Sequence, residues 1–228
     1  MKFDTESEAS ELQPITHPPG TLDFRHMDCM ELMREFPDKH FDLAVVDPPY
    51  GIGVGDNKKG MGRRKGDAKA RYKMGDWDDE PPQDKYFSEL FRVSKHQIVW
   101  GANHFIERIP LNSSCWIVWD KIFSHEMSFA SAELAWTSFA SVVKIYKGLS
   151  QCFQRIHPTQ KPVKLYDWIF SNYANSGIKV LDTHMGSGSI AIAAHYAGVH
   201  LTACEIDSDY FAAATKRIAK ETAQTSFL

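Results

Sequence analysis

The chain has 228 residues, of which 43% are hydrophobic and 24% are charged. These proportions are those of an ordinary globular domain, which excludes disordered, collagen-like and coiled-coil chains. No apolar run reaches the roughly 18 to 20 residues that a membrane span needs, and the polar start lacks the apolar segment of a secretory signal. The four cysteines are far apart and form no CxxC pair. Reduced thiols in a cytoplasm are therefore expected, rather than disulfides or a zinc site.

The formal net charge of −3 is unevenly distributed. Between Gly51 and Gly75 there are eight basic and two acidic residues, a local charge of +6 that leaves −9 for the remainder. Charge alone favours a solvated loop, but a basic loop with several glycines also suits an arm that follows nucleic-acid phosphates. The eight basic residues are Lys58, Lys59, Arg63, Arg64, Lys65, Lys69, Arg71 and Lys73.

Residues 1–20 are predicted to be a polar tail, and residues 21–228 a single domain in which strands and helices alternate. Strands are predicted at 22–28, 41–47, 97–103, 115–121, 132–138, 142–147, 179–186 and 200–207. Helices are predicted at 29–36, 82–94, 187–198 and 208–221, and after a proline-bounded turn within 157–174. This alternation predicts an α/β fold with a mainly parallel sheet covered on both faces. Such sheets bind ligands at the carboxyl ends of their strands, where three acidic residues are expected: Asp47, Asp182 and Glu205.

The segment from Val180 to Ser189 has the pattern of a strand, a tight glycine turn and the start of a helix. Glycines allow a ligand to approach the backbone, and the carboxylate of Glu205 at the next strand end can accept both hydroxyls of a ribose. Because Ala191 follows Gly186 and Gly188 at dinucleotide spacing, a nicotinamide cofactor stays possible at this point.

The sequence Asp47-Pro48-Pro49-Tyr50 follows the clearest predicted strand. Two prolines stiffen the backbone and offer no N–H groups, so the Asp47 carboxylate and the Pro48 carbonyl remain as acceptors. Tyr50 adds a flat aromatic face. A planar base with an exocyclic amine, flipped out of a duplex, suits these groups, although a simple turn after a strand has the same composition.

Taken together, these motifs resemble the amino-group DNA methyltransferases that use S-adenosylmethionine, in the permuted order called the beta class. Residues 47–50 match the catalytic DPPY motif, and residues 182–189 take the place of the DPFxGSGT motif that follows it. Residues 155–169 resemble the element just before that glycine motif, and residues 204–207 the segment that holds the cofactor ribose. The likeness covers about residues 22–218, and the segments WGANHF and AELAWTSF resemble small phage and prophage members.

The resemblance implies a Rossmann-like methyltransferase fold with a mixed, mostly parallel sheet of about seven strands. It implies catalytic roles for Asp47, Pro48, Pro49 and Tyr50. It also implies a cofactor site formed by Asp28, Lys161, Asp182, His184, Gly186, Ser187, Gly188, Ser189, Glu205 and Ile206. The expected partner is DNA, with a homodimer as an open alternative to a monomer. No metal is expected, because none of the ten histidines forms an HxxxH or HExxH pair.

Two departures from the family pattern are expected to matter. Thr183 and His184 stand where proline and phenylalanine are usual, which is expected to leave a backbone-based cofactor site intact or somewhat weakened. Only residues 138–155 are left as a target-recognition region, so the basic loop at 51–75 is expected to carry most of the DNA contacts. Recognition is therefore predicted to be short or relaxed.

The function predicted from these features is methylation of the N6 amino group of adenine in DNA. RNA adenine and DNA cytosine-N4 methylation are alternatives, because each presents an amine to the same motif. A non-catalytic subunit that binds DNA or the cofactor is a further alternative from a different class. A nicotinamide dehydrogenase would leave residues 47–50 and the basic loop unexplained.

Overall fold

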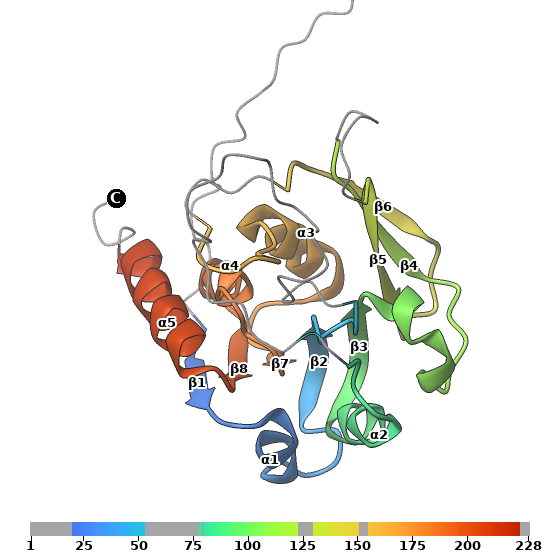
Figure 1. Ribbon diagram of the computed structural model, residues 1–228, viewed down its shortest axis with the longest axis horizontal. Helices are drawn as coiled ribbons and strands as arrows, with labels where there is room; N and C mark the ends of the chain where they lie inside the picture. The colour runs from blue at the N-terminus through green and yellow to red at the C-terminus, as the bar shows by residue number, and fades with distance from the viewer. Residues whose placement is uncertain (1–19, 53–77, 79, 123–129, 151–154, 224–228) are drawn as a thin grey trace, which may run out of the picture.

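The computed structural model describes residues 20–52, 78, 80–122, 130–150 and 155–223. These residues form one eight-stranded sheet in the order β1-β8-β7-β2-β3-β5-β4-β6 (Figure 1). The strands are β1 (Leu22–His26), β2 (Phe41–Val46), β3 (Ser94–Trp100), β4 (Trp116–Asp120), β5 (Ala132–Thr137), β6 (Lys144–Lys147), β7 (Lys179–Asp182) and β8 (His200–Glu205). The helices are α1 (Cys29–Arg34), α2 (Asp84–Val93), α3 (Val163–Tyr173), α4 (Ser189–Ala197) and α5 (Ser208–Ala223).

The predicted α/β class is confirmed, and the sheet is mixed. Among the described residues, five of its seven pairings are parallel, and the two antiparallel pairings join β5 to β3 and to β4. The eight strands match the eight predicted segments, one more than the resemblance implied. The basic loop and the N-terminal tail lie almost wholly outside the described residues, so the predicted division of the chain stays a prediction.

The core consists of two apolar layers on opposite faces of the sheet. Alternate residues of β2 supply them: Leu43 and Val45 face α3, α4 and α5, whereas Ala44 and Val46 face α1 and α2. Figure 1 shows these two groups of helices on opposite sides of the strands. The strand is apolar on both sides because both of its faces are covered.

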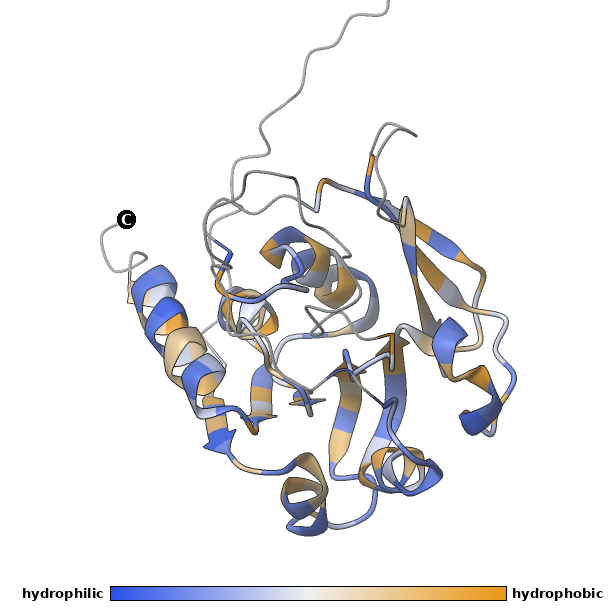
Figure 2. Cartoon of the chain, viewed as in Figure 1, coloured by the Kyte–Doolittle hydropathy of each residue, from blue (hydrophilic) through white to orange (hydrophobic). Residues whose placement is uncertain are grey.

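Helix α5 shows how the helices match the sheet. Its buried residues Tyr210, Ala214 and Ile218 recur every fourth position, and its charged residues occupy other positions of the helix. Figure 2 shows the resulting change from apolar to polar around the helix. This spacing places the three side chains on one stripe against the sheet.

Some boundaries differ from the prediction. Strand β3 begins directly where α2 ends, because Ser94 both pairs with Phe41 of β2 and donates a hydrogen bond from Oγ to the Leu90 carbonyl. The strand ends at Trp100, since Gly101 has a φ of +69°. Two short 3-10 helices, η3 (Ala102–His104) and η4 (Ile106–Arg108), follow Gly101 and were not predicted.

The topology gathers the predicted site. Strands β1, β8, β7 and β2 are adjacent and parallel, so their carboxyl ends share one edge of the sheet. Asp28, Glu205, Asp182 and Asp47 lie at or just after those four ends. The structure therefore brings together residues that are up to 177 positions apart in the sequence, as the alternating pattern predicted.

Candidate active site

The chain that follows β2 is held in a defined conformation. The Tyr50 hydroxyl donates a hydrogen bond to Asp47 Oδ1 at 2.7 Å. The backbone N–H groups of Tyr50 and Gly51 both donate to Asp78 Oδ1, at 2.7 and 3.1 Å. Pro48 and Pro49 lie between Asp47 and Tyr50, and the ring of each proline fixes its own φ. The carboxylate and the aromatic ring are therefore positioned by covalent stiffness and by hydrogen bonds from both ends of the motif.

The ring of Tyr50 lies between backbone and an aromatic neighbour. His104 stacks on Tyr50 with ring centroids 5.2 Å apart and an interplanar angle of 16°. A Cβ at Gly101 would lie only 2.1 Å from the Tyr50 ring. Gly101 is thus required twice, for its positive φ and for the close approach of this ring.

We expect Gly101→Ala to destabilise the protein by about 2 to 5 kcal/mol, combining the cost of a left-handed alanine with that of overpacking. Gly177→Ala is a matched control, because Gly177 has a φ of +83° but a Cβ there would meet no atom of the described residues within 4 Å. The free energy of unfolding of this control is expected to fall by only about 1 to 2 kcal/mol. Urea unfolding of both variants measures the difference, and equal losses would show that Tyr50 is not held by Gly101.

Asp47 belongs to a buried group of alternating charges. Lys161 Nζ contacts Asp47 Oδ2 at 2.5 Å and Glu133 Oε2 at 3.2 Å, and the Lys161 side chain is only 3% exposed. Lys121 Nζ contacts the other oxygen of Glu133 at 2.5 Å. Glu133 and Lys121 were not singled out from the sequence. The available signal was a glutamate within the otherwise apolar strand AELAWT, where an ionised group needs a partner.

The protonation of this group follows from burial and charge together. Burial raises the pKa of Asp47 and is opposed by the ammonium of Lys161. Burial alone would lower the pKa of Lys161, but the carboxylates of Asp47 and Glu133 outweigh it and raise that pKa above its usual value. Glu133 has a lowered pKa, because two lysines outweigh its burial. Lys161 is therefore charged at neutral pH.

The turn between β7 and α4 is anchored to the end of β8. Glu205 Oε2 accepts a hydrogen bond from the Gly186 N–H at 2.9 Å, and Oε1 accepts one from the Asp207 N–H at 3.0 Å. Gly186 and Gly188 have positive φ, at +51° and +73°. A Cβ at Gly188 would lie 2.7 Å from Ile218, whereas one at Gly186 would meet, among the described residues, only the His157 ring, at 3.9 Å. The space beside Gly186 is therefore open.

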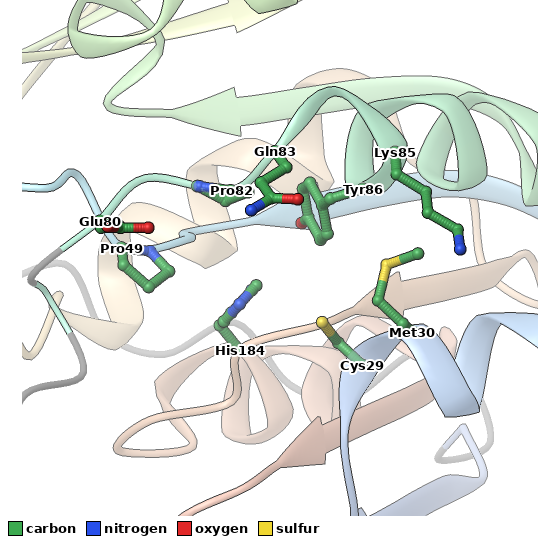
Figure 3. Close-up of a pocket in the computed structure, with 9 residues that line it drawn as sticks. All are labelled: Cys29, Met30, Pro49, Glu80, Pro82, Gln83, Lys85, Tyr86 and His184. Carbon is green, nitrogen blue, oxygen red and sulfur yellow. The ribbon is translucent and has the colours of Figure 1, made fainter.

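A cavity of about 280 Å³ opens at the same edge of the sheet. This volume is close to the lower end of the range of about 300 to 1,000 Å³ that is usual for ligand pockets. Its walls come from four segments, represented by Met30 of α1, Pro49 after β2, Tyr86 of α2 and His184 after β7. Figure 3 shows the His184 ring between Pro49 and Cys29 and directed toward Tyr86.

The two unusual residues of the glycine motif form a hydrogen-bonded chain with Tyr86. The Tyr86 hydroxyl lies 2.6 Å from Thr183 Oγ1, which lies 2.9 Å from His184 Nδ1. The His184 and Tyr86 rings are 5.6 Å apart with an interplanar angle of 60°. Burial lowers the pKa of His184 to about 4. The residue is therefore a neutral aromatic side chain, as the phenylalanine that it replaces would be.

The low pKa of His184 predicts a pH-dependent stability. The unfolded chain protonates this side chain near pH 6.5, while the folded chain does so only near pH 4, so the contribution of His184 to the free energy of unfolding falls as pH drops through this window. The raised pKa of Asp182 contributes in the opposite direction, so the prediction concerns the difference between variant and parent. His184→Phe is expected to remove at most about 3 kcal/mol of this pH-dependent loss relative to the parent. Urea unfolding of the variant and the parent between pH 4 and 7 measures this difference in the free energy of unfolding. His157, whose pKa burial also lowers to about 4, should leave a residual slope; superimposable curves for variant and parent would contradict the prediction.

The remaining predicted cofactor residues have the following contacts. Asp28 Oδ1 caps α1 by accepting from the N–H groups of Met30 and Glu31, at 2.8 and 3.2 Å. Asp182 is buried and accepts from the His184 N–H, and burial raises its pKa to about 7. Ile206 is 65% exposed. Ser187 and Ser189 are buried with their hydroxyls 3.2 Å apart. The cofactor roles of these residues, and that of Lys161, stay predictions.

The eight basic residues of the loop lie outside the described residues. Within the described ranges, no group of three or more histidine, cysteine, aspartate or glutamate side chains is arranged to hold a metal ion. None of the helices described is both long enough and apolar enough to cross a membrane. The cytoplasmic location and the homodimer stay predictions.

Comparison with known proteins agrees with this architecture. The protein YubD of Escherichia coli (strain K12) is 25% identical over 211 residues, which are 84% of this chain and 88% of YubD. The solved structure of the M1.HpyAVI–SAM complex is similar, with a TM-score of 0.58 and 18% identity over 87% of this chain and 99% of that one.

Two further solved structures share the fold. TTHA0409, a DNA modification methylase from Thermus thermophilus complexed with S-adenosyl-L-methionine, has a TM-score of 0.57 and 17% identity, covering 89% of this chain and 96% of its own. The cytosine-N4-specific PvuII DNA methyltransferase has a TM-score of 0.58 and 12% identity, and the match covers 92% of this chain and 96% of that one. A family model described as DNA methylase matches residues 99–216, more than half of the sequence. The chain therefore belongs to this family of DNA methylases, whose methyl donor is S-adenosylmethionine.

Proposed function

We propose that the chain transfers a methyl group from S-adenosylmethionine to the N6 amino group of adenine in DNA, within a short or relaxed target sequence. The observation that carries this proposal is the position of Asp47. It directly follows β2, whose neighbour β7 leads into the glycine turn, so an acceptor for an amino group and the proposed cofactor site meet at one edge of the sheet.

The residues at this edge fit the cofactor. Each oxygen of Glu205 accepts one backbone hydrogen bond and keeps a lone pair for a ribose hydroxyl. The open side of Gly186 allows close approach to the backbone, and the cavity between Met30, Tyr86 and His184 offers apolar and aromatic walls for a planar base. When bound, S-adenosylmethionine supplies a methyl group activated by a positive sulfur.

The catalytic work of the chain is to orient and polarise the amine. The amino nitrogen of adenine is a poor nucleophile, because its lone pair is delocalised into the ring. The Asp47 carboxylate and the Pro48 carbonyl would accept its two hydrogens, localise the lone pair and stabilise positive charge as it develops. Each Asp47 oxygen has one partner in the structure, the Tyr50 hydroxyl or Lys161, and a carboxylate has capacity for more.

Tyr50 would hold the target base by stacking. Its ring is already fixed by the hydrogen bond to Asp47 and by Gly101. His104 occupies a stacking position on the Tyr50 ring in this structure, so the target base would stack there only after the His104 ring has moved aside. Fixing the base beside the cofactor lowers the entropic cost of their encounter.

Cytosine N4 is the second candidate for the methylated base. Its amine would make the same two hydrogen bonds, and the similar PvuII enzyme is cytosine-N4-specific. The aspartate at position 47 favours adenine, because the resemblance associates DPPY with adenine and a first-position serine with cytosine.

The test is incubation of the purified chain with tritiated S-adenosylmethionine and unmethylated duplex DNA, followed by digestion to nucleosides and chromatography. Label in N6-methyldeoxyadenosine is expected, and its density per base measures how relaxed the target sequence is. Label in N4-methyldeoxycytidine would overturn the choice of base. An RNA of the same sequence is assayed in parallel, and label confined to the RNA would overturn the choice of nucleic acid.

A further inference from the structure

Lys161 has contacts that a cofactor ligand does not need. Its ammonium lies 2.5 Å from Asp47 Oδ2, 3.2 Å from the Tyr50 hydroxyl and 3.2 Å from Glu133 Oε2. It also lies above the rings of Tyr50 and Trp100, 5.7 and 5.3 Å from their centroids. The side chain is therefore enclosed by Asp47 and Tyr50, which are proposed to act on the target base, together with Glu133 and Trp100.

We propose that Lys161 is a positioning residue, which holds the Asp47 carboxylate ionised and oriented through a charge network completed by Glu133 and Lys121. This inference rests on the proposed function, because it assigns how the acceptor for the amine is kept ready. It gives Lys161 a role toward Asp47 rather than toward the cofactor.

The ammonium of Lys161 contacts three groups: the Asp47 carboxylate, the Tyr50 hydroxyl and the Glu133 carboxylate. Asp47 reaches Lys161 with Oδ2 and Tyr50 with Oδ1, and Lys161 also donates to the Tyr50 hydroxyl. These contacts close a triangle that fixes the carboxylate plane and the ring of Tyr50 together. A carboxylate free to rotate would present its lone pairs to the amine only part of the time, so orientation alone contributes to the rate.

The second carboxylate explains why Lys161 remains in place. Glu133, on β5, contacts Lys161 with one carboxylate oxygen, and Lys121 contacts the other oxygen and balances its charge. Two carboxylates and two ammonium groups give a neutral set of buried charges. Removing one member leaves a buried charge without compensation, which is costly in a protein interior. The titratable groups near Asp47 are thus Lys161, Glu133, Tyr50, Tyr166 and Asp182.

Two substitutions shift the ionisation of Asp47 in opposite directions. Lys161→Met removes a positive neighbour, so the acidic limb of the methylation rate against pH is expected to move to higher pH. Glu133→Gln removes a negative neighbour and is expected to move that limb to lower pH. Lys161→Met is also expected to lower turnover about 100-fold, and Lys161→Arg to restore part of it because the charge is kept.

Lys95→Met is the matched control. Lys95 also pairs with an aspartate, Asp42, at 2.7 Å, but on an exposed part of β3 far along the strand from its carboxyl end. This variant is expected to leave turnover and the pH profile unchanged. Circular dichroism of each variant establishes that it is folded, and where Lys161→Met is not, Lys161→Arg and Glu133→Gln decide the question.

A readout that does not depend on turnover separates this inference from the proposed function. Carbon-13 NMR of the full chain follows the titration of the Asp47 carboxyl, and calorimetry measures the affinity for S-adenosylmethionine. The expected result is a shifted Asp47 titration in Lys161→Met with cofactor affinity within about threefold of the parent. An unshifted titration with cofactor affinity lowered tenfold or more would overturn the inference and make Lys161 a cofactor ligand. Absence of methylation by the parent would instead overturn the proposed function.

Discussion

Asp47→Ala is expected to lower methylation of DNA at least about 1,000-fold while the affinity for S-adenosylmethionine changes little. The substitution removes the acceptor for one amine hydrogen and the negative charge that stabilises the developing ammonium; a single electrostatic contact of this kind contributes about 100- to 1,000-fold. It also releases Tyr50 and Lys161, which both contact Asp47. Single-turnover transfer of labelled methyl groups measures the rate, and calorimetry measures the affinity.

The control for this substitution is Asp42→Ala on the same strand. Asp42 accepts hydrogen bonds from Lys95 and from the Lys179 N–H near the amino end of β2, away from the candidate site. This variant is expected to methylate at the parental rate once its folding has been verified. Parental turnover by Asp47→Ala would remove the assignment of Asp47 as the group that receives the amine.

Glu205→Ala is expected to weaken binding of S-adenosylmethionine about 10- to 100-fold, the range for a hydrogen bond to a charged group. Two losses contribute, the proposed contact with the ribose and the anchor that holds the Gly186 N–H. Calorimetric titration of the variant measures the change. At saturating cofactor, turnover should recover to within a few-fold of the parent, because Glu205 is not expected to touch the target base.

Glu35→Ala is the companion control for Glu205. Glu35 caps the carboxyl end of α1 and pairs with Arg25 at 3.5 Å, with its side chain 46% exposed, and neither residue is assigned to the cofactor site. We expect its cofactor affinity to equal that of the parent. If Glu205→Ala bound the cofactor with parental affinity, the ribose contact would have to be assigned to another group.

The parts of the site that follow a strand end could be predicted from the sequence. Asp47, Asp182 and Glu205 each close an apolar strand, and parallel strands place their carboxyl ends together. The glycine turn was predictable for a similar reason, since Gly186 and Gly188 mark positions of positive φ. In these cases a local pattern and a general rule of topology were sufficient.

The contacts among charged side chains could not be predicted in the same way. Lys161, Glu133 and Lys121 come from three segments, and their pairing depends on which strand lies beside which in the antiparallel part of the sheet. The hydrogen bond from Tyr50 to Asp47 depends on a side-chain rotamer fixed by Gly101. Such details follow from packing, about which a linear pattern carries little information.

The pairing of β1 with β8 has a consequence for how the molecule is made. Among the described strands, β1 hydrogen-bonds only to β8, whose residues come about 180 positions later. During synthesis, β1 cannot form these hydrogen bonds until β8 has been made. Contacts of such long sequence separation slow folding. A ribosome-bound chain that has not yet exported β8 should therefore be unable to retain S-adenosylmethionine, which ties the onset of ligand capture to the emergence of β8 from the ribosome.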